Sequence, residues 1–260
     1  CDNHCGKISN AIKMVDEAVK ARVDIIKFQH HLPDEEMLPK VPKSSNFKLD
    51  LYKFLKKYAL KIEDHYKILK YCKKKNIKYL CTPFSWKAAQ ELNTINVKFF
   101  KIGSGEFTDT PFIERLLTLR KPIIFSTGMS DKKEIDKMYN FIKPRKKNLV
   151  AFMNCTSEYP PKINDINLNF IPEMIKRYKK FIIGHSDHTN TSVTSLGAVS
   201  LGAKIIEKHV YLDNLNFGPD RHVSISFKEL KKLKEGINIL EKDIGSNKKR
   251  YTKEIKIRSW

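Results

Sequence analysis

The sequence lacks long apolar runs and a disulfide-type cysteine pattern. Nowhere do its 260 residues contain an apolar stretch approaching the roughly 20 residues that a membrane span needs. The opening residues CDNHCGKISN contain no apolar core of a signal peptide. The five cysteines are scattered and odd in number, which fits a reducing cytoplasm better than a disulfide framework. We therefore expect a cytoplasmic protein with no membrane partner.

Acidic residues are scarce relative to basic ones. Lysine and arginine number 50 against 29 aspartates and glutamates, for a formal net charge of +21. A basic chain can bind nucleic acid. The lysines are nevertheless interleaved with acidic residues, and the sequence has no arginine-rich tract and no aromatic-stacking motif. We interpret the charge as a solvated surface that would attract phosphorylated substrates, and we expect no nucleic-acid partner.

The sequence also lacks a 33- or 40-residue hydrophobic repeat, which argues against a solenoid. Short apolar runs instead alternate with helix-length segments, a pattern typical of a parallel α/β sheet. Strands are expected at residues 23–28, 79–81, 99–102, 123–126, 149–154, 181–183 and 205–206. Helices are expected at residues 8–21, 62–75, 86–92, 111–119, 132–142, 171–178, 195–201 and 227–244.

Seven strands, each followed by a helix, and a first helix with no strand before it predict a (β/α)8 barrel, also called a TIM barrel. Its first strand would lie upstream of Cys1, so we expect a fragment that lacks this strand. We assign residues 1–245 to the barrel domain and residues 246–260 to the start of a linker. Residues 32–46 hold three prolines and predict a long excursion, which suggests a lid or binding loop.

Two histidines, His188 and His209, each follow an expected buried strand. Because the carboxyl ends of parallel strands face the same side, both imidazoles should point into the opening at that end of the barrel, which we call the mouth. Imidazole suits a divalent transition metal such as Mn, Fe or Zn. Asp187, Glu207 and Asp220 could supply carboxylates to the ion or to its ligands. The structural alternative is a pair of buried histidines that only satisfy backbone groups.

Cationic and hydroxyl side chains recur at the expected strand ends. The set comprises two lysines and four hydroxyl residues: Lys27, Lys101, Thr82, Ser104, Ser126 and Ser186. Gathered at one mouth, these groups would form an oxyanion or phosphate site. A salt bridge to a carboxylate such as Glu106 is the alternative for each lysine taken singly. A metal beside a phosphate site suits Lewis-acid activation of a carbonyl in a reaction with a phosphorylated small molecule.

At these residues the sequence closely resembles the sialic acid synthase (N-acetylneuraminate synthase) family. The matching motifs occur in family order as NH-x-G at Asn3 to Gly6, then KFQ, CTPF, KIGSGE, STGM, CTSEYP, GHSDHT, EKH and GPD. The resemblance implies condensation of phosphoenolpyruvate with N-acetylmannosamine or a related N-acetylated aldose. The products would be a sialic-acid-type nonulosonate and phosphate. A legionaminate or pseudaminate synthase of the same chemistry is the enzyme alternative, and a truncated, inactive barrel is the other.

The resemblance also implies roles for individual residues. His188 and His209 would hold a divalent ion that polarises the sugar aldehyde, with Mn²⁺ expected and Mg²⁺ or Co²⁺ as alternatives. Phosphoenolpyruvate would be held by Lys27, Lys101, Thr82, Ser104, Ser126, Ser157 and Ser186. The sugar would be contacted by Gln29, Glu106, Tyr159 and Asp220. The residues expected to be catalytic are Lys27, Lys101, Glu106 and Asp220.

Departures from the family pattern bear on these expectations. The family's first strand ends in a glutamate shortly before the Asn-His pair, and this chain begins too late to contain it. Family members also carry a small C-terminal antifreeze-like domain that reaches the partner subunit, so we expect a homodimer in the full-length form. Arg22 stands at a usual glycine, and His30 and His31 follow KFQ where threonine is common. These changes are expected to affect the sugar pocket.

Overall fold

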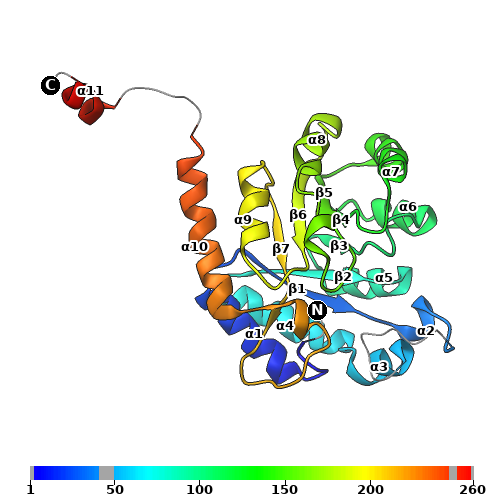
Figure 1. Ribbon diagram of the computed structural model, residues 1–260. Helices are drawn as coiled ribbons and strands as arrows, with labels where there is room; N and C mark the ends of the chain where they lie inside the picture. The colour runs from blue at the N-terminus through cyan, green and yellow to red at the C-terminus, as the bar shows by residue number, and fades with distance from the viewer. Residues whose placement is uncertain (1–2, 41–49, 246–250, 259–260) are drawn as a thin grey trace.

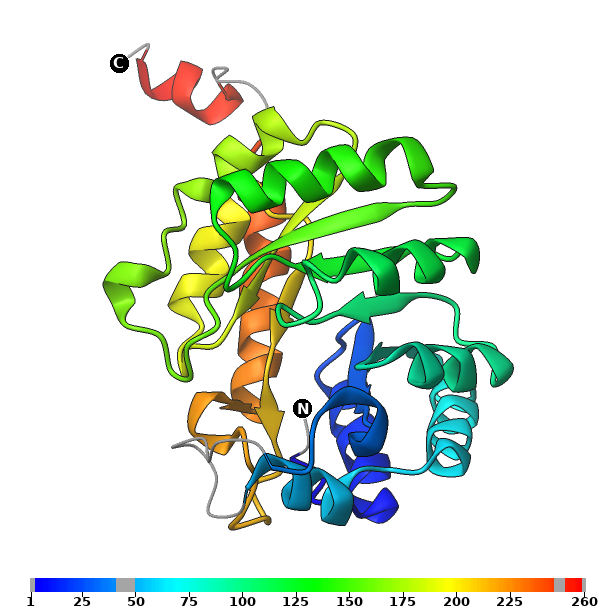
Figure 2. The same cartoon turned by 90° about the vertical axis from the view of Figure 1, so that its right-hand side faces the viewer.

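The computed structural model of the protein describes residues 3–40, 50–245 and 251–258. Seven parallel strands follow one another in sequence order across one curled sheet, and helices cover its outer side (Figures 1 and 2). The strands are β1 (Ile25–His30), β2 (Lys78–Pro83), β3 (Phe100–Ile102), β4 (Ile123–Ser126), β5 (Val150–Cys155), β6 (Ile182–Asp187) and β7 (Ile206–Lys208). The helices that alternate with them are α1 (Ile8–Lys20), α4 (Ile62–Lys74), α5 (Trp86–Thr94), α6 (Thr110–Thr118), α7 (Lys132–Arg145), α8 (Phe170–Arg177), α9 (Val193–Ser200) and α10 (Phe227–Asp243). Each predicted strand and helix overlaps one of these elements.

Side chains at the helix starts explain where two of the longest helices begin. The Asp131 carboxylate accepts from the backbone N–H of Glu134, and the Glu134 carboxylate accepts from that of Asp131, which forms a capping box at α7. Ser226 and Glu229 form the same box at α10. An N-cap contributes about 1 kcal/mol to stability. Local sequence therefore fixes where α10 starts, and α10 packs against α9 and α1.

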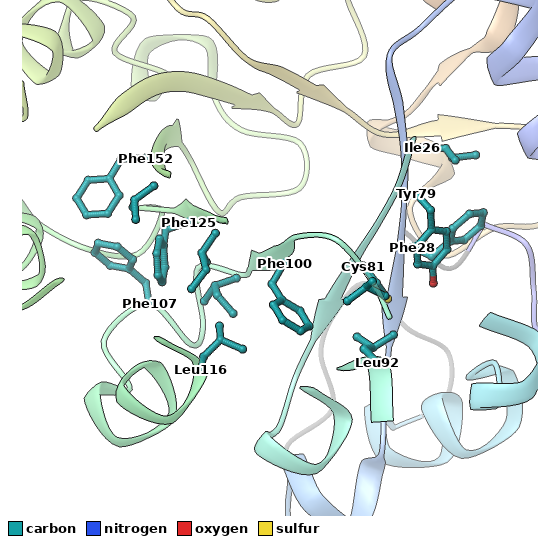
Figure 3. Close-up of a cluster of buried hydrophobic side chains, with 14 of the residues drawn as sticks. Ile26, Phe28, Tyr79, Cys81, Leu92, Phe100, Phe107, Leu116, Phe125 and Phe152 are labelled. Atoms are coloured by element: carbon teal, nitrogen blue, oxygen red, sulfur yellow. The ribbon is translucent and has the colours of Figure 1, made fainter. Parts of the chain in front are cut away.

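Aromatic side chains fill the core around β3 to β5. Phe107, Phe125 and Phe152 are fully buried, and their rings meet edge to face with centroids 5.4 to 6.2 Å apart (Figure 3). Such pairs add about 0.5–1.5 kcal/mol beyond the area that they bury. This packing holds β4 and β5 against the loop after β3, so the polar residues at these strand ends stand on a rigid support.

The sheet is a curled half-barrel rather than a closed barrel. Its order runs from β1 to β7, and within the described residues these two strands do not pair with each other. A cavity of about 530 Å³ lies between them, lined by Ile25 and Ile26 of β1, Ile206 of β7, and residues of α1 and α10. This is where a (β/α)8 barrel would hold its eighth strand. The predicted barrel class is confirmed, with seven described strands.

The predicted excursion at residues 32–46 is only partly a loop. It contains α2 (Pro33–Glu36), while residues 41–49 lie outside the described part of the chain. A helix that the sequence analysis did not predict, α3 (Leu51–Tyr58), follows and buries Phe54 and Leu55. The predicted linker contains α11 (Thr252–Arg258), all of whose residues are exposed. The division into barrel and linker stays a prediction.

Several short elements close the loops around the mouth. They are the two-stranded sheet of β8 (Val210–Tyr211) and β9 (Ile225–Ser226), and the 3₁₀ helices η1 (Ile163–Asp165) and η2 (Arg221–Val223). Elements of two or three residues carry no readable periodicity, which is why the sequence did not predict them. Among the described helices, none combines the length and apolar character that crossing a bilayer requires.

Candidate active site

An ion-pair group lies at the carboxyl ends of the strands. The Lys27 Nζ atom of β1 lies 2.9 Å from Oε1 of Glu207 on β7, and Lys101 Nζ of β3 lies 3.7 Å from the same oxygen. Lys101 also donates to Ser126 Oγ of β4 at 2.6 Å, and Ser186 Oγ of β6 donates to Glu207 at 2.9 Å. Residues from five strands thus form one connected group, which we call the lysine cluster.

Burial sets the charge balance of the lysine cluster. It lowers the pKa of Lys101, which is 2% exposed, to about 8, although the carboxylate of Glu207 opposes this shift. Burial would raise the pKa of Glu207, but the charges of Lys101 and Lys27 outweigh it and hold that pKa well below its ordinary value. The cluster at neutral pH therefore has two cations around one anion. An incoming dianion could replace Glu207 as their partner.

Hydroxyl groups also gather at these strand ends. A Cβ atom at Gly128 would lie 2.2 Å from Ser157 Oγ and 2.7 Å from Ser104 Oγ, so only glycine leaves room for these two hydroxyls above the backbone. Thr82 is 2% exposed, and its Oγ1 atom has no hydrogen-bond partner among the described residues. A buried hydroxyl without a partner is costly unless a ligand completes it. The structure therefore brings these hydroxyls together, and the anion site stays a prediction.

The two predicted metal-binding histidines lie together beside the lysine cluster. The rings of His188 and His209 are 5.2 Å apart between centroids and nearly perpendicular. The Nδ1 atom of His188 donates to the carbonyl of Thr156 at 2.8 Å. Its Nε2 atom accepts from the hydroxyl of Tyr159 at 3.3 Å, and the Tyr159 ring stacks on the imidazole. The Nδ1 atom of His209 lies 3.3 Å from Oδ2 of Asp220.

This pair fits a divalent ion in its donor chemistry. Burial and the neighbouring His209 lower the pKa of His188 to about 3, and burial also lowers the pKa of His209 despite Asp220. Both rings are therefore neutral at pH 7, the form that binds metal. No group of three or more histidine, cysteine or acidic side chains in the described residues is arranged to hold an ion. Water or substrate would have to complete the coordination.

Asp187 does not belong to this mouth. Its carboxylate accepts from Ser195 Oγ at 2.6 Å and lies 2.9 Å from Lys208 Nζ. Strand register explains the difference, because Ser186 pairs with Glu207 and the next pair, Asp187 with Lys208, points to the opposite face. The prediction that Asp187 serves the ion or its ligands is wrong, and Glu207 contacts the lysines.

The predicted sugar residues border a cavity of about 270 Å³ next to the histidine pair, which we call the α2–α3 pocket. Its polar walls are Gln29, His31, Glu36, Glu106 and Asp220, and its apolar walls are Met37, Leu51, Phe54, Leu55, Phe84 and Pro219. Tyr159 lies at the histidine pair instead of lining this pocket. Three of the four predicted sugar-contacting residues therefore share one cavity. The fourth, Tyr159, contacts His209, which lies 3.3 Å from Asp220 of that cavity.

Glu106 has an unusual environment within the α2–α3 pocket. Its Oε2 atom is buried and has no hydrogen-bond partner among the described residues. Burial raises the pKa of Glu106 to about 7, and the negative charge of Glu36 adds to that shift. Gly103 permits this position, since a Cβ atom there would lie 2.6 Å from Oε2. A carboxyl group with a pKa near neutrality can both donate and accept a proton.

Sequence reasoning missed two parts of the site. It treated Glu207 as a carboxylate near the metal, whereas the structure pairs it with Lys27. The signal was available, because Glu207 ends the last predicted strand and Lys27 ends the first one in the sequence, and these strands come near each other when a sheet curls into a barrel. It also missed Glu36 and the apolar wall from α3, since these come from the proline-containing excursion whose path depends on tertiary contacts. The roles assigned to the remaining site residues stay predictions.

The fold is that of an α/β-barrel enzyme, with a buried cluster of two lysines and a glutamate at its strand ends. The chain belongs to the NeuB family, whose profile matches residues 14–249. It is 34% identical over 260 residues to the N,N'-diacetyllegionaminic acid synthase of Campylobacter jejuni, which covers 96% of this chain and 77% of that protein. It is 30% identical over 249 residues to the human N-acetylneuraminate-9-phosphate synthase, with 94% and 69% covered.

The crystal structure of the N-acetylneuraminic acid synthetase of Leptospira borgpetersenii has the same fold. It superposes with a TM-score of 0.87 at 28% identity and covers 99% of this chain and 87% of that one. The predicted resemblance to sialic acid synthases is confirmed. The chain is accordingly an enzyme of the sugar-acid synthase type.

Proposed function

We propose that the protein condenses phosphoenolpyruvate with N-acetylmannosamine or a related N-acetylated aldose. The enolpyruvate C3 atom forms a bond to the aldehyde carbon, and the aldehyde oxygen takes up a proton to become a hydroxyl. Water adds at C2, and the resulting intermediate releases phosphate to leave a nonulosonate with a 2-keto group. The observation that carries this proposal is the lysine cluster, a phosphate-type anion site, directly beside two neutral histidines and the α2–α3 pocket.

The lysine cluster would bind the phosphorylated substrate. Lys27 and Lys101 would exchange Glu207 for the phosphate and carboxylate of phosphoenolpyruvate, with hydroxyls such as Ser126 as further donors. The same two lysines would offset the negative charge of the intermediate at C2. Donors already aimed at that charge in a buried site stabilise it without reorganisation.

The acceptor sugar would enter the α2–α3 pocket. Gln29 and Asp220 would orient its hydroxyl groups, Tyr159 would flank the aldehyde, and Glu106 would supply a proton to the aldehyde oxygen. His188 and His209 would hold the divalent ion, for which Mn²⁺ is the first candidate and Mg²⁺ and Co²⁺ are alternatives. When bound, that ion supplies Lewis-acid polarisation of the carbonyl. The proposal includes a homodimer for the full-length form, which sedimentation of that form would test.

Phosphate release from phosphoenolpyruvate in the presence of N-acetylmannosamine and Mn²⁺ tests the proposal. The native chain should release phosphate only when both substrates are present, and Lys101→Met should abolish release because it removes one buried cation. Lys98→Met is the matched control, since Lys98 is exposed at the other end of the same strand region. A panel of N-acetylated hexoses with the precursors of legionaminate and pseudaminate would identify the acceptor. Release without any sugar, or from none of the panel, would contradict the proposed condensation.

A further inference from the structure

The side chain of Asn3 bonds to segments that lie 207 to 221 residues further along the chain. Its Nδ2 atom donates to the carbonyl of Val210 at 2.8 Å and to Ser224 Oγ at 3.0 Å. Its Oδ1 atom accepts from the backbone N–H of Asp220 at 3.0 Å. Asn3 is 1% exposed, so these bonds are made away from water. One buried amide group therefore uses both its donors and its acceptor.

The partners of Asn3 flank the contact between His209 and Asp220. Val210 directly follows His209 in the chain, and Oδ2 of Asp220 lies 3.3 Å from Nδ1 of His209. Asn3 thus bonds to the backbone beside His209 with its Nδ2 atom and to the backbone of Asp220 with its Oδ1 atom. The 3.3 Å separation is at the long end of the hydrogen-bond range, so a small outward movement of Asp220 would end the contact.

The loop between β8 and β9 leaves room for this amide group. A Cβ atom at Gly218 would lie 2.6 Å from Asn3 Oδ1. The φ of Gly218 is outside the left-handed region, so glycine is needed here for the close approach and not for the backbone conformation. Ser224 Oγ, which accepts from Asn3, donates to the carbonyl of Asp220 at 2.6 Å. Asn3 and Ser224 therefore hold Asp220 by its N–H and its carbonyl.

The same loop has a separate support in Arg221. Its Nη1 atom donates to the carbonyls of Leu212 and Leu215 at 3.2 and 2.6 Å, and its guanidinium lies 4.0 Å from the centroid of the Tyr211 ring. These contacts do not involve Asn3, so the loop should stay folded when the Asn3 side chain is truncated. Loss of that side chain is then expected to move Asp220 without unfolding the loop.

We infer that Asn3 is a positioning residue: it holds Asp220 against His209, and Asp220 in turn fixes the orientation of the His209 ring. The inference rests on the proposed function, in which His209 helps to hold the divalent ion. When one ring nitrogen of a metal-binding histidine faces a carboxylate, the proton stays on that nitrogen and the other nitrogen binds the metal. Asn3 begins the NH-x-G motif, which the proposed function leaves without a role.

Asn3→Ala tests the inference through Mn²⁺ affinity, measured by calorimetry on the full chain without substrates. Replacing residues that orient a metal ligand lowers metal affinity by about 10- to 100-fold, and we expect about tenfold because Asn3 acts through Asp220. Affinity for phosphoenolpyruvate, measured without metal, should change by about twofold at most, since the hydrogen bonds of Asn3 do not run to the lysine cluster. A general loss of stability would not separate the two ligands in this way.

Gly218→Ala perturbs the same contact from the side of the loop. Its Cβ would displace Asn3 Oδ1, so Mn²⁺ affinity should fall by about three- to tenfold. Adding Gly218→Ala to Asn3→Ala should cost no further affinity, because the atom that the new Cβ displaces is already gone. Gly218→Ala also tests the inference on its own if Asn3→Ala does not fold.

Asn10→Ala is the matched control. Asn10 is also a buried asparagine, at 8% exposed, and its Nδ2 atom donates to the carbonyl of His4 at 3.0 Å. Its truncation removes a buried hydrogen bond of the same kind in the same part of the chain. Thermal unfolding should therefore show a comparable loss of stability for Asn10→Ala and Asn3→Ala, while Asn10→Ala keeps the native affinity for Mn²⁺.

Nitrogen-15 NMR of the histidine rings provides a readout that needs no metal. A carboxylate beside Nδ1 favours the tautomer with the proton on that atom, so native His209 should show this tautomer at neutral pH. Asn3→Ala should show a mixture of the two tautomers at His209. His209→Ala identifies the signals by their loss.

The outcomes separate the inference from the proposed function. Equal Mn²⁺ affinities of Asn3→Ala and Asn10→Ala would overturn the inference, and so would losses from Asn3→Ala and Gly218→Ala that simply add. A native chain that bound no Mn²⁺ would contradict the proposed metal site. The His209 tautomer would then decide the inference, because an unchanged tautomer in Asn3→Ala would overturn it.

Discussion

Replacing Glu207 by glutamine should destabilise the free protein and strengthen its response to phosphoenolpyruvate. Among the described residues, Glu207 is the carboxylate that pairs with both Lys27 and Lys101. Removing one partner from a fully buried ion pair costs about 3–5 kcal/mol, because the other charge stays buried and unpaired. The exposures of Lys101, Glu207 and Lys27 are 2%, 15% and 20%, so water reaches part of this group.

We therefore expect a loss of about 2–3 kcal/mol in the free energy of unfolding. At about 2–4 °C per kcal/mol, Tm should fall by about 4–12 °C. Phosphoenolpyruvate should then raise the Tm of Glu207→Gln more than that of the native chain, since the ligand no longer competes with a carboxylate for the two lysines. Calorimetric unfolding with and without the ligand measures both effects.

Glu173→Gln is the control for this experiment. Glu173 pairs with Lys132 on the surface, where both side chains are nearly half exposed, and such pairs contribute about 0–1 kcal/mol. Its Tm and its response to phosphoenolpyruvate should both be close to those of the native chain. If Glu207→Gln lost no more stability than this control, the lysines would not depend on Glu207. If its response to the ligand were no larger, they would not form the anion site.

Three further predictions concern the hydroxyls, the lysine charge and a buried histidine. Gly128→Ala should weaken phosphoenolpyruvate binding by about tenfold, because its Cβ would displace Ser157 Oγ. Gly105→Ala, whose Cβ would meet nothing closer than 3.9 Å, should leave it unchanged, and calorimetry compares the two. Burial lowers the pKa of Lys101 to about 8, so affinity for phosphoenolpyruvate should fall by up to about tenfold from pH 8 to pH 9, as an affinity profile would show. Burial also lowers the pKa of His30, so its contribution to stability is complete above about pH 6.5 and declines below it. Urea midpoints should drop toward pH 5 in the native chain and less so in His30→Gln; equal slopes would contradict the assignment.

The barrel and the strand-end residues were predictable from sequence because both follow from periodicity. Buried parallel strands read as short apolar runs, and their carboxyl ends must meet at one face. His188, His209, Lys27 and Lys101 could therefore be grouped from the order of the residues along the chain. The structure places all four at the same mouth.

The partners of these residues were not predictable in the same way. Whether Asp187 or Glu207 faces the mouth depends on the register between β6 and β7, and one step in register exchanges the two faces. The position of Glu36 depends on its contact with His31, five residues earlier, and so on how the chain turns from β1 into α2. A turn of this kind leaves no periodic signal in the chain.

The most direct test of the central claim is the identity of the product. Phosphoenolpyruvate labelled with ¹³C at C3 and N-acetylmannosamine would be incubated with the chain and Mn²⁺, and carbon NMR would follow the label. The account predicts a labelled methylene joined to the former aldehyde carbon, with one phosphate released per product, and loss of both signals in His209→Ala. Labelled pyruvate in place of the condensed acid, or undiminished product from His209→Ala, would contradict it.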